Sequence, residues 1–229
     1  MKSNLSIPAG KSFTLKAFLV LWLLTLPIGL HAQTAPDGAS YLQQIEKRYE
    51  NVNTFRAKFL QISKAPGVVK TEKASGIVYL RKDGKFRWDY DKPEVVLIVS
   101  DGKTLWIYQA EDKQVMIDES FGKKLKRFPY TFLNGMQRLH EDFDAKVLNS
   151  KGKMVTLELI PKKNLKEITK MLITFDKDTL LIKKIQWVSS QEVKTIITFD
   201  DIDITSKIPD SVFHFEPPEG VDIVRADTP

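Results

Sequence analysis

The chain has 229 residues, no cysteine, and a formal net charge of +6 from 35 basic and 29 acidic residues. The absence of cysteine excludes disulfides and thiol chemistry. Residues 1–32 contain three lysines and no acidic residue, so the remainder carries only +3. That charge is too small for a nucleic-acid-binding surface, and we expect no nucleic-acid partner.

The N-terminal segment has the pattern of a secretory signal peptide. Lysines precede an apolar run from Ala17 to Leu30, and a polar stretch follows Ala32. A permanent membrane anchor is the alternative, but a proline and a glycine interrupt a run that is already short for a bilayer. We expect cleavage after residues 1–32 and a single domain over residues 33–229.

An amphipathic helix is predicted at the start of this domain. Ser40 and Gln43 have the spacing of a capping box, which places the first turn there. Apolar residues then share one helical face, namely Leu42, Ile45, Tyr49 and Val52. Such a helix must lie on an apolar surface.

Segments of alternating apolar and polar residues follow at short spacing, separated by turn sequences. Eleven strands are predicted, at 55–62, 74–81, 86–90, 95–99, 104–108, 114–118, 145–149, 154–160, 168–176, 180–188 and 193–201. The pattern breaks between 119 and 144, where apolar spacing closer to helical predicts one or two short helices.

One hairpin carries more apolar surface than a hairpin needs. Asp83-Gly84 makes its turn, and Phe86, Trp88 and Tyr90 return on one face of the second strand. A stripe of three aromatic side chains either fills a core or receives an apolar ligand.

A long antiparallel succession of strands curls and encloses apolar volume. With helices before it and within it, the predicted fold is mainly β with helices (α+β). We expect an unclosed, curved antiparallel β-barrel of about eleven strands with a helical lid over an apolar cavity. Helices that simply complete the core of the sheet are an equally weighted alternative.

No catalytic or metal-binding pattern is found. His140 and His214 lack partners at ligand spacing, and the acidic run 200–203 lacks the spacing and glycine of a calcium loop. The basic cluster 123–127 suits anionic lipid head groups or an acidic partner, and a solvated loop is the alternative. We therefore expect neither an enzyme nor a bound cofactor.

Five segments carry a family resemblance. They are Gly76–Trp88, Val99–Tyr108, Pro129–Leu133, Leu159–Lys162 and Phe213–Asp222. In this order, over most of residues 33–229, they resemble the periplasmic outer-membrane lipoprotein carrier family, LolA. The outer-membrane receptor of that system is itself a lipoprotein with an N-terminal cysteine, so the absence of cysteine indicates the soluble carrier.

The resemblance implies a monomeric periplasmic carrier. Its apolar cavity would receive the acyl chains of lipoproteins, which an ABC transporter releases from the inner membrane and an outer-membrane receptor accepts. A lipid-responsive sensor or accessory domain on the same fold is the alternative.

The resemblance also implies the site. The expected cargo-binding residues are Phe59, Val78, Leu80, Phe86, Trp88 and Tyr90, with Tyr130, Phe132 and Leu133 from the lid. The family latches its lid with an Arg that precedes a Pro before the hairpin turn, where this chain has Lys82-Asp83. Lys82 would hold a lid less firmly, since it lacks the planar guanidinium, and Arg81, one residue earlier, should point to the other face.

Overall fold

The computed structural model describes residues 37–124, 139–162 and 168–226, which lie in one compact unit, Ala35–Pro229. Twelve strands of this part of the chain form a single sheet. In chain order the elements are α1 (Gly38–Glu50), β1 (Thr54–Lys64), β2 (Glu72–Arg81), β3 (Phe86–Lys92), β4 (Val96–Ser100), β5 (Leu105–Gln109), β6 (Gln114–Asp118), α2 (Phe121–Lys124), α4 (Leu139–Asp142), β7 (Phe143–Lys151), β8 (Met154–Pro161), β9 (Ile168–Asp176), β10 (Ile182–Ser189), β11 (Lys194–Asp203), the 3-10 helix η1 (Asp210–Phe213) and β12 (Asp222–Arg225).

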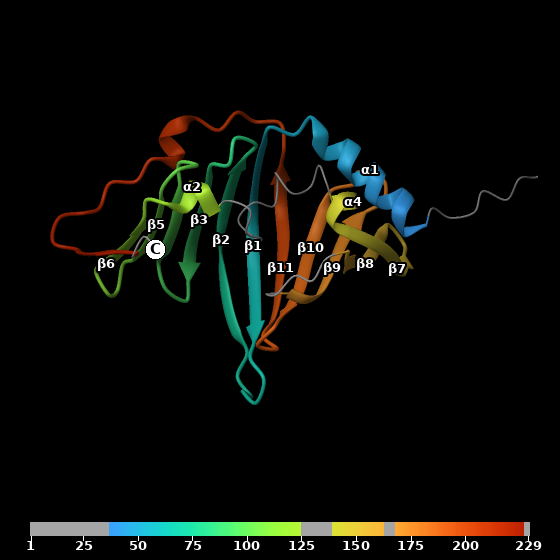
Figure 1. The fold of residues 1–229 in the computed structure, drawn as a ribbon, viewed down its shortest axis with the longest axis horizontal. Helices are drawn as coiled ribbons and strands as arrows, with labels where there is room; N and C mark the ends of the chain where they lie inside the picture. The colour runs from blue at the N-terminus through green and yellow to red at the C-terminus, as the bar shows by residue number, and fades with distance from the viewer. Residues whose placement is uncertain (1–36, 125–138, 163–167, 227–229) are drawn as a thin grey trace, which may run out of the picture. The chain divides into compact units, whose positions relative to one another are not determined.

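The sheet consists of two antiparallel series of strands that meet at its centre. Strands β1 to β6 pair in succession, as do β7 to β11, and β1 pairs with β11. The order β12-β6-β5-β4-β3-β2-β1-β11-β10-β9-β8-β7 leaves β12 and β7 as separate edges. The sheet is therefore curved and unclosed (Figure 1). The predicted incomplete barrel and its eleven strands are confirmed.

The twelfth strand was not anticipated. β12 pairs in parallel with β6, with Asp222 opposite Gln114 and Arg225 opposite Ile117. The strand has only four residues and no hairpin partner next to it in the sequence. Its pairing joins segments about a hundred residues apart, which no local pattern could indicate.

Helix α1 packs on one face of the sheet, which we call the inner face. Tyr41 meets Phe175 of β9 with ring centroids 5.2 Å apart, and Gly38 lies so close to β7 that a Cβ would sit 2.1 Å from the Ala145 carbonyl oxygen. The helix thus covers the half of the inner face that runs toward the β7 edge (Figure 1).

The start of α1 corrects the predicted cap. The N-cap residue is Asp37, whose carboxylate accepts a hydrogen bond from the Ser40 backbone N–H at 2.8 Å. Ser40 lies in the first turn instead, so the capping-box interpretation was wrong by three residues. Both residue types cap helices well, and the sequence pattern alone does not choose between them.

The outer face holds a second, smaller apolar cluster toward the β12 edge. Val99, Val115 and Ile117 are buried there. The C-terminal segment, residues 207–226, covers them and contributes its own buried Ile208 and Phe213. Its Phe215 ring lies 5.8 Å from Tyr108 and 6.5 Å from Trp106. The chain therefore fills the apolar surface on this face with its own residues.

Candidate functional site

A cluster of aromatic rings occupies the inner face where β1 and β3 flank β2. The Phe59 ring lies 4.9 Å from both Trp88 and Tyr90, and Trp88 stacks on Tyr90 at 6.4 Å. Gly76 of β2 stands in register between Phe59 and Tyr90. Because Gly76 has no side chain, the two rings can meet across the intervening strand.

The structure brings all six described cargo-binding candidates onto this face, but it separates them by burial. Phe59, Val78, Leu80, Phe86 and Trp88 are each at most 3% exposed and belong to the main hydrophobic core. Only Tyr90 is half-buried and borders unfilled volume. The remaining candidates, Tyr130, Phe132 and Leu133, lie outside the described residues.

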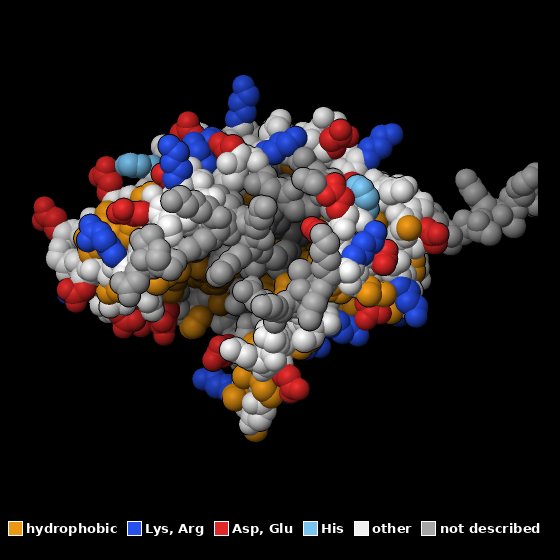
Figure 2. All heavy atoms as spheres, viewed as in Figure 1, with side chains coloured by type: hydrophobic (Ala, Val, Ile, Leu, Met, Phe, Trp, Pro, Cys, Tyr) orange, Lys and Arg blue, Asp and Glu red, His pale blue; other side chains and the backbone are white. Residues whose placement is uncertain are grey.

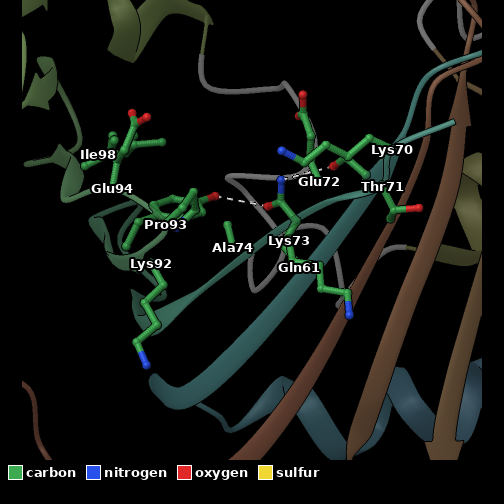
Figure 3. A pocket seen from close by; sticks show the side chains of 13 residues that line it. Gln61, Lys70, Thr71, Glu72, Lys73, Ala74, Lys92, Pro93, Glu94 and Ile98 are labelled. Atoms are coloured by element: carbon green, nitrogen blue, oxygen red, sulfur yellow. Dashed lines mark hydrogen bonds between the residues drawn. The ribbon is translucent and has the colours of Figure 1, made fainter. Parts of the chain in front are cut away.

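The unfilled volume is a hollow of about 700 Å³ at the Tyr90 end of the aromatic cluster. Pockets of roughly 300–1,000 Å³ hold small organic ligands in other proteins. The hollow is formed by the ends of β1 and β2, the loop that joins them, and the β3–β4 connection (Figure 3). Its lining residues are Gln61, Ser63, Lys70, Thr71, Glu72, Lys73, Ala74, Tyr90, Lys92, Pro93, Glu94, Val96 and Ile98.

Most of these lining residues were missed by the sequence analysis. The signal that could have found several of them is register: Gln61 continues the Phe59 side of β1, and Val96 stands opposite Tyr90. Period-two alternation therefore predicts their face once strand pairing is known. The loop that closes the hollow carries no such pattern.

The hollow has an apolar floor and a charged rim. Ile98, Val96 and Tyr90 line it from the sheet, whereas the lysine and glutamate side chains come from the ends of β2 and β3 and from the adjoining loops. The Tyr90 hydroxyl donates a 3.1 Å hydrogen bond to the Gln61 side-chain carbonyl. An apolar chain could therefore enter beside Tyr90 while a polar head group stays at the rim.

The indole N–H of Trp88 is buried without a hydrogen-bond partner in the described part of the chain. A buried donor left unpaired costs on the order of 1–3 kcal/mol. This group lies in the same ring cluster as Tyr90.

The two residues considered as a latch point to different places. The Lys82 ammonium donates at 2.8 Å to the Glu50 carbonyl, at the end of α1. Arg81 instead binds Asp83 and Asp210 by salt bridges of 2.7 and 2.5 Å, and its guanidinium lies over the Phe213 ring. Hydrogen bonding to Arg81 lowers the pKa of Asp83.

Arg81 thus serves the C-terminal segment on the outer face, and Lys82 contacts the helix on the inner face. The expected lid at Tyr130–Leu133 lies outside the described residues, so a latch at Lys82 or Arg81 stays a prediction.

The groups that were considered for metals have structural partners. His140 contacts both carboxylate oxygens of Glu46 at 2.9 Å, Asp201 pairs with Lys58 at 2.7 Å, and the Asp203 carboxylate accepts backbone hydrogen bonds from Thr205 and Ser206. His214 is exposed and contacts Glu216. Within residues 37–124, 139–162 and 168–226, no group of three or more His, Asp or Glu side chains could hold a metal ion.

None of the described helices is long and apolar enough to cross a membrane. The basic cluster 123–127 has its side chains outside the described residues.

An unclosed sheet with an apolar inner face and an unfilled hollow has the architecture of a container for an apolar ligand. Comparison with known proteins agrees. The family described as outer membrane lipoprotein carrier protein LolA matches residues 50–216. The chain belongs to this family, which confirms the resemblance found in the sequence.

Relatives of this family match along most of their length. The outer-membrane lipoprotein carrier protein of Nitrosomonas europaea is 31% identical over 210 residues, covering 90% of this chain and 96% of that protein. The protein of the same name from Chromobacterium violaceum is 33% identical over 193 residues, covering 84% and 91%.

A solved structure, an uncharacterized conserved protein from Thermus thermophilus, has a TM-score of 0.52 and 14% identity, covering 82% of this chain and 98% of that one. That likeness concerns the fold alone.

Proposed function

We propose that this protein carries lipoproteins through the periplasm, with their acyl chains held against the inner face of the sheet and in the hollow beside Tyr90. The hollow is the observation that carries the proposal, because it leaves apolar surface next to unfilled volume. Family membership supports the cargo class. Residues 1–32 would direct export and be removed, which leaves residues 33–229 as the carrier.

The magnitude of the hydrophobic effect explains why a carrier is needed. Transferring an acyl chain of about 16 carbons from water to an apolar site is favourable by about 12 kcal/mol, at about 0.8 kcal/mol per methylene. A lipoprotein with several such chains cannot cross an aqueous compartment unshielded. The apolar floor and the charged rim of the hollow suit a ligand with an acyl tail and a polar head.

The hydrophobic effect also explains why the carrier needs no catalytic activity. Moving an acyl chain from a bilayer to an apolar cavity exchanges one hydrocarbon environment for another, so the free-energy difference is small. Direction would come from an inner-membrane ABC transporter that loads the carrier and from an outer-membrane receptor with higher affinity. We therefore propose a non-enzymatic carrier with these two partners.

The proposal is tested by release of cargo from membranes. The purified protein, from Gln33 onward, is incubated with energised spheroplasts, and the supernatant is assayed for acylated lipoprotein in complex with it. A soluble stoichiometric complex is expected, and de-energised spheroplasts should yield none. If no lipoprotein is released and ordinary phospholipid co-purifies with the protein, the carrier function is wrong, and the lipid-responsive sensor becomes the better account.

A further inference from the structure

The loop between β1 and β2 ends in an exposed apolar tip, residues Ala65–Lys70, which we call the β1–β2 tip. Val69 is 97% exposed and Val68 is 48% exposed, the former being the highest value among the exposed large apolar residues of the described chain. The loop extends beyond the end of the sheet (Figure 1). Figure 2 shows hydrophobic side chains at the end of this protrusion.

Nothing in the fold requires valines at this tip. The ladder between β1 and β2 ends at the Ser63–Glu72 pair, and a short turn closes the loop, with the Val68 N–H donating to the Ala65 carbonyl at 3.3 Å. Gly67 has φ +74°, and a Cβ added to it would meet no other atom within 4 Å, so the turn itself is open. Two adjacent exposed valines at a free tip lower solubility unless a partner covers them.

The tip is attached to the rim of the hollow. The hollow is lined by the segment that connects the tip to β2 and by the first residues of that strand, namely Lys70, Thr71, Glu72 and Lys73 (Figure 3). Whatever the valines contact is therefore held next to the entrance beside Tyr90.

The charge around the tip favours an anionic partner. Lysines surround the tip and the adjacent rim at positions 64, 70, 73 and 92, against glutamates at 72 and 94. Anionic lipid head groups attract such lysines, and exposed aliphatic side chains insert at the boundary between head groups and acyl chains. A tip of six residues is far smaller than the roughly 800 Å² that each partner contributes to a stable protein interface.

From these observations we propose that the β1–β2 tip is a membrane-contact element that touches the surface of an anionic lipid bilayer. Val68 and Val69 enter the head-group region, and Lys64 and Lys70 pair with anionic head groups. The contact holds the rim of the hollow against the bilayer during loading or delivery. This purpose rests on the proposed carrier function, but the contact itself needs no cargo.

The test uses the absence of cysteine from the chain. Val69→Cys is labelled with an environment-sensitive dye and mixed with vesicles of phosphatidylethanolamine and phosphatidylglycerol. Lys151→Cys, at the exposed end of β7 beside the turn to β8, is the matched control because this turn carries lysines and no exposed valine pair. The dye at position 69 should report transfer to a less polar environment on adding vesicles, and the dye at position 151 should not.

Two further variants test the chemistry. Replacing both valines with serine should reduce vesicle binding about tenfold, and Lys64→Gln should reduce it about fivefold and weaken its dependence on salt. Unchanged emission from position 69 with these vesicles would overturn the proposal, and the tip would then be either a protein-docking element or a solvated loop.

Because these measurements contain no lipoprotein, they are independent of the carrier function. A protein that releases lipoprotein from spheroplasts but does not bind vesicles would retain the proposed function and lose this inference.

Discussion

Neighbouring residues of β4 point to opposite faces of the sheet and differ in how far they are buried. Val99 points to the outer face and is 0% exposed, under the C-terminal segment of the chain. Val96 and Ile98 point to the inner face, are half-buried and line the hollow. The same strand therefore has one apolar face that the chain fills itself and one that borders unfilled volume. The first serves stability, and the second is available to a ligand.

The largest expected effect is at the closed end of the inner face. Phe86 is 1% exposed and packs against Phe121 at 5.7 Å. Phe86→Ala should lower the free energy of unfolding by about 3–5 kcal/mol, through lost burial and the cavity left behind. Chemical denaturation measures this. A loss below about 1 kcal/mol would show that Phe86 borders ligand space and is not a core residue.

A similar substitution on the outer face should affect stability without affecting cargo. Phe213 is 1% exposed and anchors the C-terminal segment beneath Arg81. Phe213→Ala should cost about 3 kcal/mol, and the fraction that remains folded should bind lipoprotein like the wild type. If this variant is as stable as the wild type but fails to take up cargo, the assignment of the outer face to stability is wrong.

The half of the inner face under α1 should respond to high pH. Burial raises the pKa of Tyr49 from 10.0 to about 12, against the opposing hydrogen bond from the Ile182 N–H. The folded state thus keeps this proton at a pH where the unfolded chain loses it. The stabilisation is complete below pH 10 and disappears between pH 10 and about 12, a loss of about 2–3 kcal/mol.

Tyr49→Phe is the control for that pH dependence. The variant should be less stable at neutral pH, because it leaves the Ile182 N–H without its acceptor. Denaturation across the alkaline range should show a smaller decline for this variant than for the wild type. If stability declined equally with pH in the two proteins, the alkaline loss could not be assigned to Tyr49.

The smallest expected change in stability lies at the open end of the inner face. Val96→Glu places a carboxylate in the hollow, where water still reaches it, and should cost less than about 1 kcal/mol. Lipoprotein uptake should fall about tenfold, because a charge opposes entry of an acyl chain. Val95→Glu is the matched control, since Val95 is 48% exposed and does not line the hollow. If the two variants took up lipoprotein equally well, the hollow would not be part of the cargo-binding site.

The sequence predicted the features that depend on local alternation. Phe86, Trp88 and Tyr90 share a face because residues two apart in a strand do so, and Arg81 and Lys82 diverge for the same reason. The assignment of Phe86 to the core and of Tyr90 to the hollow was not predictable. It depends on how the β1–β2 and β3–β4 loops close around one end of the sheet.

Two other features depend on contacts that are distant in the sequence. β12 forms only because the C-terminal segment crosses the outer face and returns to β6. Val99 is buried because the same C-terminal segment covers it. Val99 and Ile98 are neighbouring apolar residues in one strand, so the local sequence does not distinguish them. Alternation therefore identifies two apolar faces of β4 but does not reveal which one the chain covers.

The central claim, that cargo occupies the inner face, is tested most directly by photo-crosslinking from neighbouring residues of β4. A photoreactive amino acid is placed at Val96 or at Leu97, which point to the inner and outer faces, and each protein is loaded with lipoprotein. We expect the acyl chain to crosslink to position 96 and not to position 97. Crosslinking at 97 alone, in a complex that forms normally, would contradict the claim.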